Sequence, residues 1–160
     1  MKNITDALMN NKERINNFLS QLDSERRYFD ITIERIMSWK LVMIEEADNK
    51  INAIVALEKK FGMTRSAIIL KRELQGKGLG KILLEQLIDE ARKKHHIVWA
   101  IISEKNMASI KLHLAKDFRF IGNRQNLFYL AAPLDFVGHI LFHSFAKLFP
   151  LTKIFDKIRH

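Results

Sequence analysis

Near the N-terminus, apolar residues recur at intervals of three, four and seven, which is the spacing of one face of a helix. These residues are Leu8, Ile15, Phe18, Leu19 and Leu22. Thr5 or Asp6, just upstream, has a side chain suited to capping a helix N-terminus. The pattern therefore predicts one or two helices between residue 6 and about residue 28.

Short apolar runs rich in β-forming residues follow this helical region. The runs at residues 39–46 and 51–59 flank the turn sequence Asp48-Asn49-Lys50, and together they predict an antiparallel hairpin. A third apolar run, at residues 67–70, predicts a strand that leads into a cluster of glycines. The predicted strand thus ends at the glycine cluster.

Downstream of the glycines, helical and strand patterns alternate. Apolar residues at helical spacing continue to the basic stop Arg92-Lys93-Lys94 and predict a helix. The run IVWAII predicts a buried strand, residues 107–116 a short helix, and RFIG and NLFYLA two last strands around a turn at Asn123. In this order only one or two connections can join parallel strands. The sequence therefore predicts an α/β fold of the α+β type with a mixed, mostly antiparallel sheet.

Composition limits the class of protein. The 160 residues, 48% of them apolar, suit one domain with an ordinary core, and the lack of cysteine excludes disulfides, thiolate catalysis and cysteine-ligated metals. The N-terminus lacks a signal-peptide core, and no apolar run reaches about 18 residues, so we expect a soluble, cytoplasmic protein. The formal charge of +9 favours acidic partners such as phosphate-bearing cofactors, nucleic acid or anionic lipid.

The glycine cluster, QGKGLG at residues 75–80, lies between a predicted strand and a predicted helix. In this position backbone amides and the positive end of the helix converge on an anion, so phosphate binding is the leading interpretation and a plain tight turn the alternative. A dinucleotide fingerprint needs glycine where Lys81 stands. A P-loop needs glycine where Gln75 stands and a hydroxyl where Ile82 stands. Both nucleotide motifs are excluded.

What remains, Gln75-x-x-Gly78-x-Gly80, resembles the acyl-coenzyme A motif Gln/Arg-x-x-Gly-x-Gly/Ala of the GNAT superfamily of N-acetyltransferases. A second segment, NMASIKLHLAKDF at residues 106–118, is similar to that family's Asn-x-x-Ala/Ser-x-x-Leu-Tyr-x-x-x-Gly-Phe. His113 stands in place of the tyrosine, a variant that resembles phosphinothricin-type acetyltransferases. Asp117 replaces the glycine, and aspartate tolerates the left-handed conformation better than most residues.

The resemblance implies a GNAT-like acetyl-CoA-binding acyltransferase domain over residues 1–132, with helices on both faces of the sheet, and a C-terminal extension over residues 133–160. Its first strand would be short or absent, since only residues 1–5 precede the helices. The implied reaction is direct transfer of an acetyl group from acetyl-CoA to a primary amine of an unknown acceptor. A catalytically weak or inactive CoA-binding regulatory module is the alternative function.

The resemblance also implies which residues bind the cofactor. Backbone groups at Leu70 and Arg72 would pair with the pantetheine arm, and the amides of the glycine loop would hold the pyrophosphate, with lysine side chains adding positive charge. Asn106 would form a hydrogen bond on the pantetheine or substrate side. The full set is Leu70, Arg72, Gln75, Gly76, Lys77, Gly78, Leu79, Gly80, Lys81, Asn106 and Ser109.

For proton transfer, the resemblance places His113 where the family's tyrosine protonates the departing thiolate. A packed histidine without a proton role is the alternative. Candidates for the general base are Glu73 and Glu104, with Glu34 as a further carboxylate expected near a strand. No metal site is expected, because the histidine pairs lack a carboxylate at ligand spacing. Nucleic acid is not an expected partner, since no basic face with interleaved aromatics is visible.

The C-terminal extension is enriched in phenylalanine, with five of the 11 in the chain. Its apolar and basic residues separate onto two helical faces, which predicts two basic amphipathic helices joined at Pro150. The apolar faces are Leu141, Phe142, Phe145, Leu148 and Phe149, then Leu151, Ile154, Phe155 and Ile158, with His139, His143 and Lys147 opposite the first. We expect packing on the chain's own fold or on a second subunit as a homodimer. Contact with an anionic membrane surface is the alternative.

Overall fold

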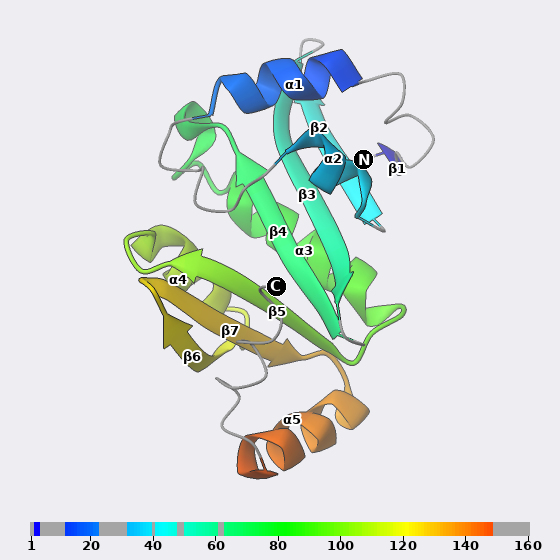
Figure 1. The fold of residues 1–160 in the computed structure, drawn as a ribbon, viewed down its shortest axis with the longest axis vertical. Helices are drawn as coiled ribbons and strands as arrows, with labels where there is room; N and C mark the ends of the chain where they lie inside the picture. The colour runs from blue at the N-terminus through cyan, green and yellow to red at the C-terminus, as the bar shows by residue number, and fades with distance from the viewer. Residues whose placement is uncertain are drawn as a thin grey trace. The chain divides into compact units, whose positions relative to one another are not determined.

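The computed structural model describes residues 2–3, 12–22, 32–39, 41–47, 50–60 and 63–148. The chain divides into two compact units, one of residues 1–58 and 67–83 and the other of residues 59–66 and 84–160. The elements are β1 (Lys2–Asn3), α1 (Lys12–Ser20), α2 (Ile33–Met37), β2 (Leu41–Ala47), β3 (Lys50–Lys60), β4 (Met63–Leu70), η3 (Arg72–Leu74), α3 (Leu79–Arg92), β5 (Ile97–Ser103), α4 (Met107–Leu114), β6 (Arg119–Arg124), β7 (Leu127–Pro133) and α5 (Phe136–Leu148) (Figure 1). The strand order is β1-β2-β3-β4-β5-β7-β6.

The strands of the first unit form the predicted hairpin and a short edge. β2 pairs antiparallel with β3, and the two-residue β1 pairs antiparallel with β2 at Ile44 and Met43. The first strand is therefore short, as predicted from the small number of residues that precede the helices. β2 begins at Leu41 rather than at the predicted Trp39, whose amide instead donates to the carbonyl of Ile36 in the turn after α2.

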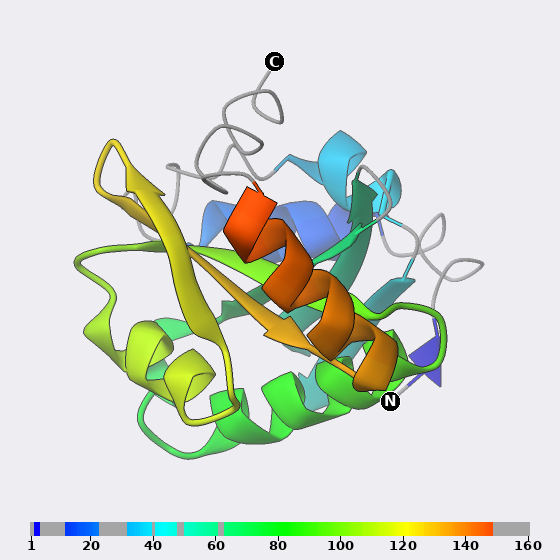
Figure 2. The ribbon, with the colours of Figure 1, turned by 90° about the horizontal axis from the view of Figure 1, so that it is seen from below.

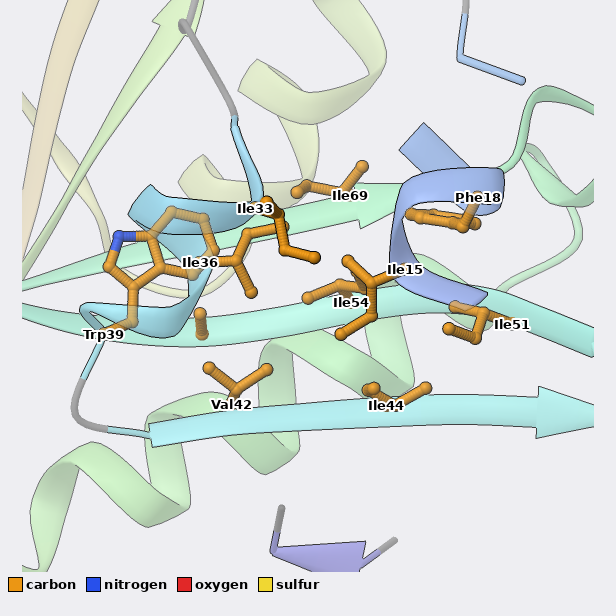
Figure 3. Close-up of a cluster of buried hydrophobic side chains, with 11 residues drawn as sticks. Ile15, Phe18, Ile33, Ile36, Trp39, Val42, Ile44, Ile51, Ile54 and Ile69 are labelled. Carbon is orange, nitrogen blue, oxygen red and sulfur yellow. The ribbon is translucent and has the colours of Figure 1, made fainter. Parts of the chain in front are cut away.

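A cluster of 11 buried side chains holds the helices of the first unit against its strands (Figure 3). Ile15 and Phe18 descend from α1, and Ile33 and Ile36 from α2, toward the side chains of the hairpin. Alternation along β2 puts Val42 and Ile44 on this face. Thr32 caps α2, its hydroxyl accepting from the amide of Arg35 at 3.2 Å. The rest of the predicted helical range 6–28 lies outside the described residues, apart from α1 and residues 21–22.

The second unit contains a parallel pairing, β4 with β5, through Thr64–Val98 and Arg65–Trp99. β7 pairs antiparallel with both β5 and β6, so the connection from β5 through α4 to β6 passes over β7. Residues 84–92 of α3 and all of α4 lie on one side of these strands and α5 on the other (Figure 2). This is the predicted mixed, mostly antiparallel sheet with helices on both faces.

The last hairpin turns two residues later than predicted. Asn123 lies inside β6, and the turn is formed by Gln125 and Asn126, whose φ angles are 49° and 63°. Two successive left-handed residues make the turn that matches the twist of paired strands, and here neither residue is glycine. In β6 the pairing register shifts between Phe120 and Gly122.

Helix α5 is fixed to the start of β5 by contacts of its first turn. Asp135 caps the helix, since its Oδ1 accepts from the amide of Gly138 at 2.7 Å, and its Oδ2 lies 2.7 Å from Nδ1 of His96. The amide of Leu134 donates to the carbonyl of His96 at 2.8 Å. The second predicted helix of the extension, beyond Pro150, lies outside the described residues. Within the described ranges, no helix combines the length and apolar character needed to cross a membrane.

Candidate functional site

The glycine loop belongs to the first unit and begins where β4 ends. The amide of Lys71 donates to the carbonyl of Asn52 on β3 at 3.1 Å, which fixes the end of the strand. The η3 turn follows, closed by the amide of Gln75 donating to the carbonyl of Arg72 at 3.1 Å. The Gln75 side chain also reaches back, with Nε2 donating to the carbonyl of Leu70 at 3.4 Å. Backbone hydrogen bonds and the Gln75 side chain thus hold the start of the loop against the end of β4.

Gly76 and Gly78 have φ angles of 76° and 84°, a conformation that L side chains rarely adopt. A Cβ at either position would meet no atom within 4 Å, so conformation rather than crowding requires glycine. Helix α3 begins directly after the loop, and the amide of Lys81 closes its first turn on the carbonyl of Gly78 at 3.0 Å. The amides of residues 76–80 find no acceptor among the described residues. Open backbone donors at a helix N-terminus are what an anion such as a pyrophosphate needs.

The structure brings together the predicted cofactor positions that lie between residues 70 and 81. Leu70 is buried at the end of β4, Arg72 is exposed in η3, and Leu79 and Gly80 are half-buried in the first turn of α3. Lys77 and Lys81 are both exposed on this short segment. Two flexible cations therefore accompany the open amides, which adds to the attraction for a phosphate group.

The remaining predicted residues lie in the second unit, on α4. Asn106 caps this helix, and its Oδ1 accepts from the amide of Ser109 at 3.0 Å. The amide of Asn106 donates to the carbonyl of Ser103 at 2.9 Å, so the cap joins α4 to the end of β5. Asn106 thus has a structural role that the sequence comparison did not include. Its role toward a cofactor stays a prediction.

His113 is buried in the last turn of α4, with 5% of its surface exposed. Its Nδ1 lies 2.8 Å from the carbonyl oxygen of Ser109, which can only accept, so Nδ1 carries a proton. The ring meets Phe118 edge to face at a centroid distance of 4.9 Å. Burial lowers the pKa of His113 below its ordinary value, and the hydrogen bond to the Ser109 carbonyl opposes this in part. The resting imidazole is therefore neutral at neutral pH, with the lone pair on Nε2.

The turn after α4 keeps this histidine in place. The amides of Lys116 and Phe118 both donate to the carbonyl of His113, at 2.9 and 3.2 Å. Asp117 between them has a φ of 62°. The sequence prediction that aspartate adopts the left-handed conformation in place of glycine is confirmed.

The carboxylates named as candidate bases lie on different elements, Glu34 and Glu73 in the first unit and Glu104 in the second. Glu73 is exposed in η3, and Glu104 is half-buried in the turn after β5, where its amide donates to the carbonyl of Asn126 at 2.9 Å. Glu34 was expected near a strand, and this is wrong because it lies in the first turn of α2. Its own backbone amide, and then the Thr32 hydroxyl, lower the pKa of Glu34. Among the described residues, no group of three or more histidines and carboxylates could hold a metal ion.

The sequence did not identify the two groups that contact the His113 ring, the Ser109 carbonyl and Phe118. The Ser109 carbonyl acts through its backbone, and Phe118 acts through a ring contact across a turn. The spacing of four residues between Ser109 and His113 on a helix is a usable signal for the first. No local pattern predicts the second.

Comparison with known proteins gives the relatives of this chain. Residues 41–120 match the model of the acetyltransferase (GNAT) family. The chain is 32% identical over 108 residues to the L-methionine sulfoximine/L-methionine sulfone acetyltransferase of Salmonella typhimurium. This match covers 61% of the chain and 60% of that relative. The chain thus spans about three fifths of the length of the curated protein that it matches.

Two solved structures have a similar fold. A putative acetyltransferase from Salmonella typhimurium, solved with its cofactor acetyl-CoA, aligns with a TM-score of 0.53 and 25% identity over 72% of this chain and 76% of that chain. A putative phosphinothricin N-acetyltransferase aligns with a TM-score of 0.57 and 21% identity over 66% of this chain and 79% of that chain, a likeness that shows the fold alone. These findings confirm the predicted fold class and the resemblance first seen in the two motifs.

Proposed function

Because the chain belongs to the GNAT family of acetyltransferases, we propose that it transfers an acetyl group from acetyl-CoA to the amine of a small amino-acid-type acceptor. The observation that carries this proposal is the glycine loop, whose left-handed Gly76 and Gly78 precede a helix and leave a row of amides open. The named activity of the Salmonella relative supports an amino-acid derivative as acceptor. We assign the activity to residues 1–132 and the reaction to the cytoplasm.

The residues present fit the cofactor at its most charged part. We propose that the open amides of residues 76–80 hold the pyrophosphate, with the side chains of Lys77 and Lys81 adding charge. Leu70 and Arg72 would meet the pantetheine arm through their backbone groups, as an added strand does. Bound acetyl-CoA supplies the activated acetyl thioester.

His113 is proposed to move the proton of the reaction at Nε2. The Ser109 carbonyl fixes Nδ1 as the protonated nitrogen, which leaves Nε2 as the only ring atom that can take up a proton and release it. Because burial lowers the pKa of the ring, Nε2 carries no proton at rest. Nε2 would take up the proton that the attacking amine loses as its bond to the acetyl carbon forms, and would give this proton to the thiolate as the C–S bond breaks. Glu73 and Glu104 remain the proposed bases for the acceptor amine.

The first experiment measures cofactor binding as a thermal shift. At a hundredfold excess over its dissociation constant, acetyl-CoA adds about 2.7 kcal/mol, or roughly 5–10 °C in a chain of this size. Gly78→Asp should abolish the shift by placing a side chain and a negative charge on the anion site. Gln86→Glu adds the same charge to an exposed position of α3 and should keep the shift. Equal shifts in all three proteins would refute the assignment of the loop.

The second experiment tests turnover and acceptor. Mass spectrometry should detect acetylation of L-methionine sulfoximine or L-methionine sulfone, with polyamines and an N-terminal peptide amine as competing classes. His113→Phe should lower kcat by roughly a hundredfold or more while the acetyl-CoA thermal shift is unchanged, because it removes a proton carrier and no binding group. Cofactor binding without acetylation of any amine would indicate the non-catalytic module instead.

A further inference from the structure

Helix α5 has a buried side and an exposed apolar side. Phe142 is 9% exposed, and the guanidinium of Arg119 on β6 lies 6.0 Å from the centre of its ring. On the opposite side Phe136, Val137 and Ile140 are 78%, 46% and 52% exposed. The predicted packing of the extension on its own fold therefore accounts for one face of α5 only. The other face presents three large apolar side chains within two helical turns.

This exposure is fixed by the way the helix is attached. The Asp135 carboxylate holds both the Gly138 amide and the His96 ring, and the His96 carbonyl accepts from Leu134. A Cβ on Gly138 would fall on the carbonyl oxygen of His96, so the helix backbone lies directly against this residue. The first turn cannot rotate to hide Phe136 without breaking these contacts.

The acidic groups near the exposed face are paired, Asp135 with His96 at 2.7 Å and Glu90 with Lys93 at 2.5 Å. Helix α5 contains no acidic residue, and His139 and His143 are exposed beside the apolar side chains. Lys93 and Lys94 stand just before His96, at the contact that holds the first turn of α5. By sequence, residues 149–160 add three Lys or Arg and one Asp. The chain as a whole carries a formal charge of +9.

An exposed apolar face on a chain with a formal charge of +9 suits an anionic membrane better than a second copy of the chain. A stable dimer buries about 800 Å² per partner and some 20–30 residues a side, far more than three side chains provide, and two such faces would bring like charges together. An interfacial helix needs only a few large apolar groups at the acyl boundary with basic groups at the headgroups. We propose that the outward face of α5 docks the protein reversibly on an anionic lipid surface. This proposal is independent of the acetyltransferase activity.

The test is sedimentation of the full chain with vesicles of phosphatidylcholine, with or without about one third phosphatidylglycerol. The protein should bind the vesicles that contain phosphatidylglycerol and should not bind those of pure phosphatidylcholine. Added salt should weaken this binding. The double variant Phe136→Gln/Ile140→Gln should lower the partition coefficient by about tenfold or more, since binding scales with the apolar area inserted. Lys94→Glu should weaken binding in the same direction.

The matched control is Met107→Gln/Leu114→Gln on α4, where both side chains are also exposed, by 53% and 41%. It should bind vesicles as the unchanged protein does, and all variants should keep the same melting temperature because the changed residues lie at the surface. The proposal is overturned if the protein ignores anionic vesicles, if the α5 variant binds normally, or if the control loses as much. If light scattering shows that the protein is a dimer and that the α5 variant is a monomer, the outward face of α5 binds a second copy of the chain and not a membrane.

Discussion

Gly138→Ala isolates the contact that positions α5, because two effects of opposite sign meet at this residue. Replacing glycine by alanine in a helix interior ordinarily stabilises the fold by about 1 kcal/mol. Here the new Cβ would overlap the carbonyl oxygen of His96 and lie 3.0 Å from its carbonyl carbon. Both are backbone atoms, so no side chain can rotate away to make room.

The magnitude follows from what must move. Overpacking of this kind costs about 1–3 kcal/mol. Displacing the first turn of α5 also weakens the hydrogen bond from Leu134 to the His96 carbonyl, at 2.8 Å, which contributes about 1 kcal/mol. After the gain in helix propensity, the free energy of unfolding should fall by about 1–3 kcal/mol, or roughly 2–10 °C in melting temperature.

Urea unfolding followed by circular dichroism measures this difference. Ser144→Ala is the matched control, because Ser144 is exposed on the same helix and its replacement changes propensity without a clash. The control should be stabilised by a few tenths of a kcal/mol. If Gly138→Ala proves as stable as the control, the close approach of α5 to His96 is not present in solution.

Three further predictions concern single groups. Asp117→Val should be about 1–2 kcal/mol less stable than Asp117→Gly in urea, because the φ of 62° suits glycine and strains a β-branched residue, and equal stability would contradict that angle. The lowered pKa of His113 means that the unfolded chain takes up a proton which the folded chain does not. The free energy of unfolding should therefore fall as pH drops below 6.5, and His113→Phe should flatten that part of the profile. The pKa of Asp135 is lowered first by the Gly138 amide and then by His96, so its stabilisation is present above pH 3.8 and is lost as pH falls through the lowered pKa. A stability profile of Asp135→Asn should lack this acid-side loss.

The features that the sequence predicted correctly depend on residues that are close together along the chain. Gly76 and Gly78 stand where the backbone must adopt a positive φ, and no distant contact is needed to see this. Asp117 adopts the left-handed conformation for the same local reason. Helix α3 follows from apolar periodicity and ends at Arg92, where the basic stop was recognised.

The features that the sequence could not predict depend on residues far apart in the chain. His96 is paired with Asp135, 39 residues away, a contact that no local pattern indicates. The turn at Gln125-Asn126 contains no glycine and has glutamine as its first left-handed residue, so the sequence before it, at Gly122-Asn123, was the stronger local signal. The lowered pKa of His113 depends first on its burial, and burial is known only after the chain has folded.

The register shift in β6 bears on how copies of this chain behave at high concentration. β6 is the last strand in the order, and an outermost strand with a regular ladder invites a strand of another molecule to extend the sheet. Here the ladder changes register between Phe120 and Gly122, and exposed arginines, Arg119 and Arg124, stand at the two ends of the strand. An incoming strand would lose its alignment midway and would meet positive charge at both ends. The irregularity in β6, which contains Gly122 and Asn123, therefore disfavours extension of the sheet by a strand of a second molecule.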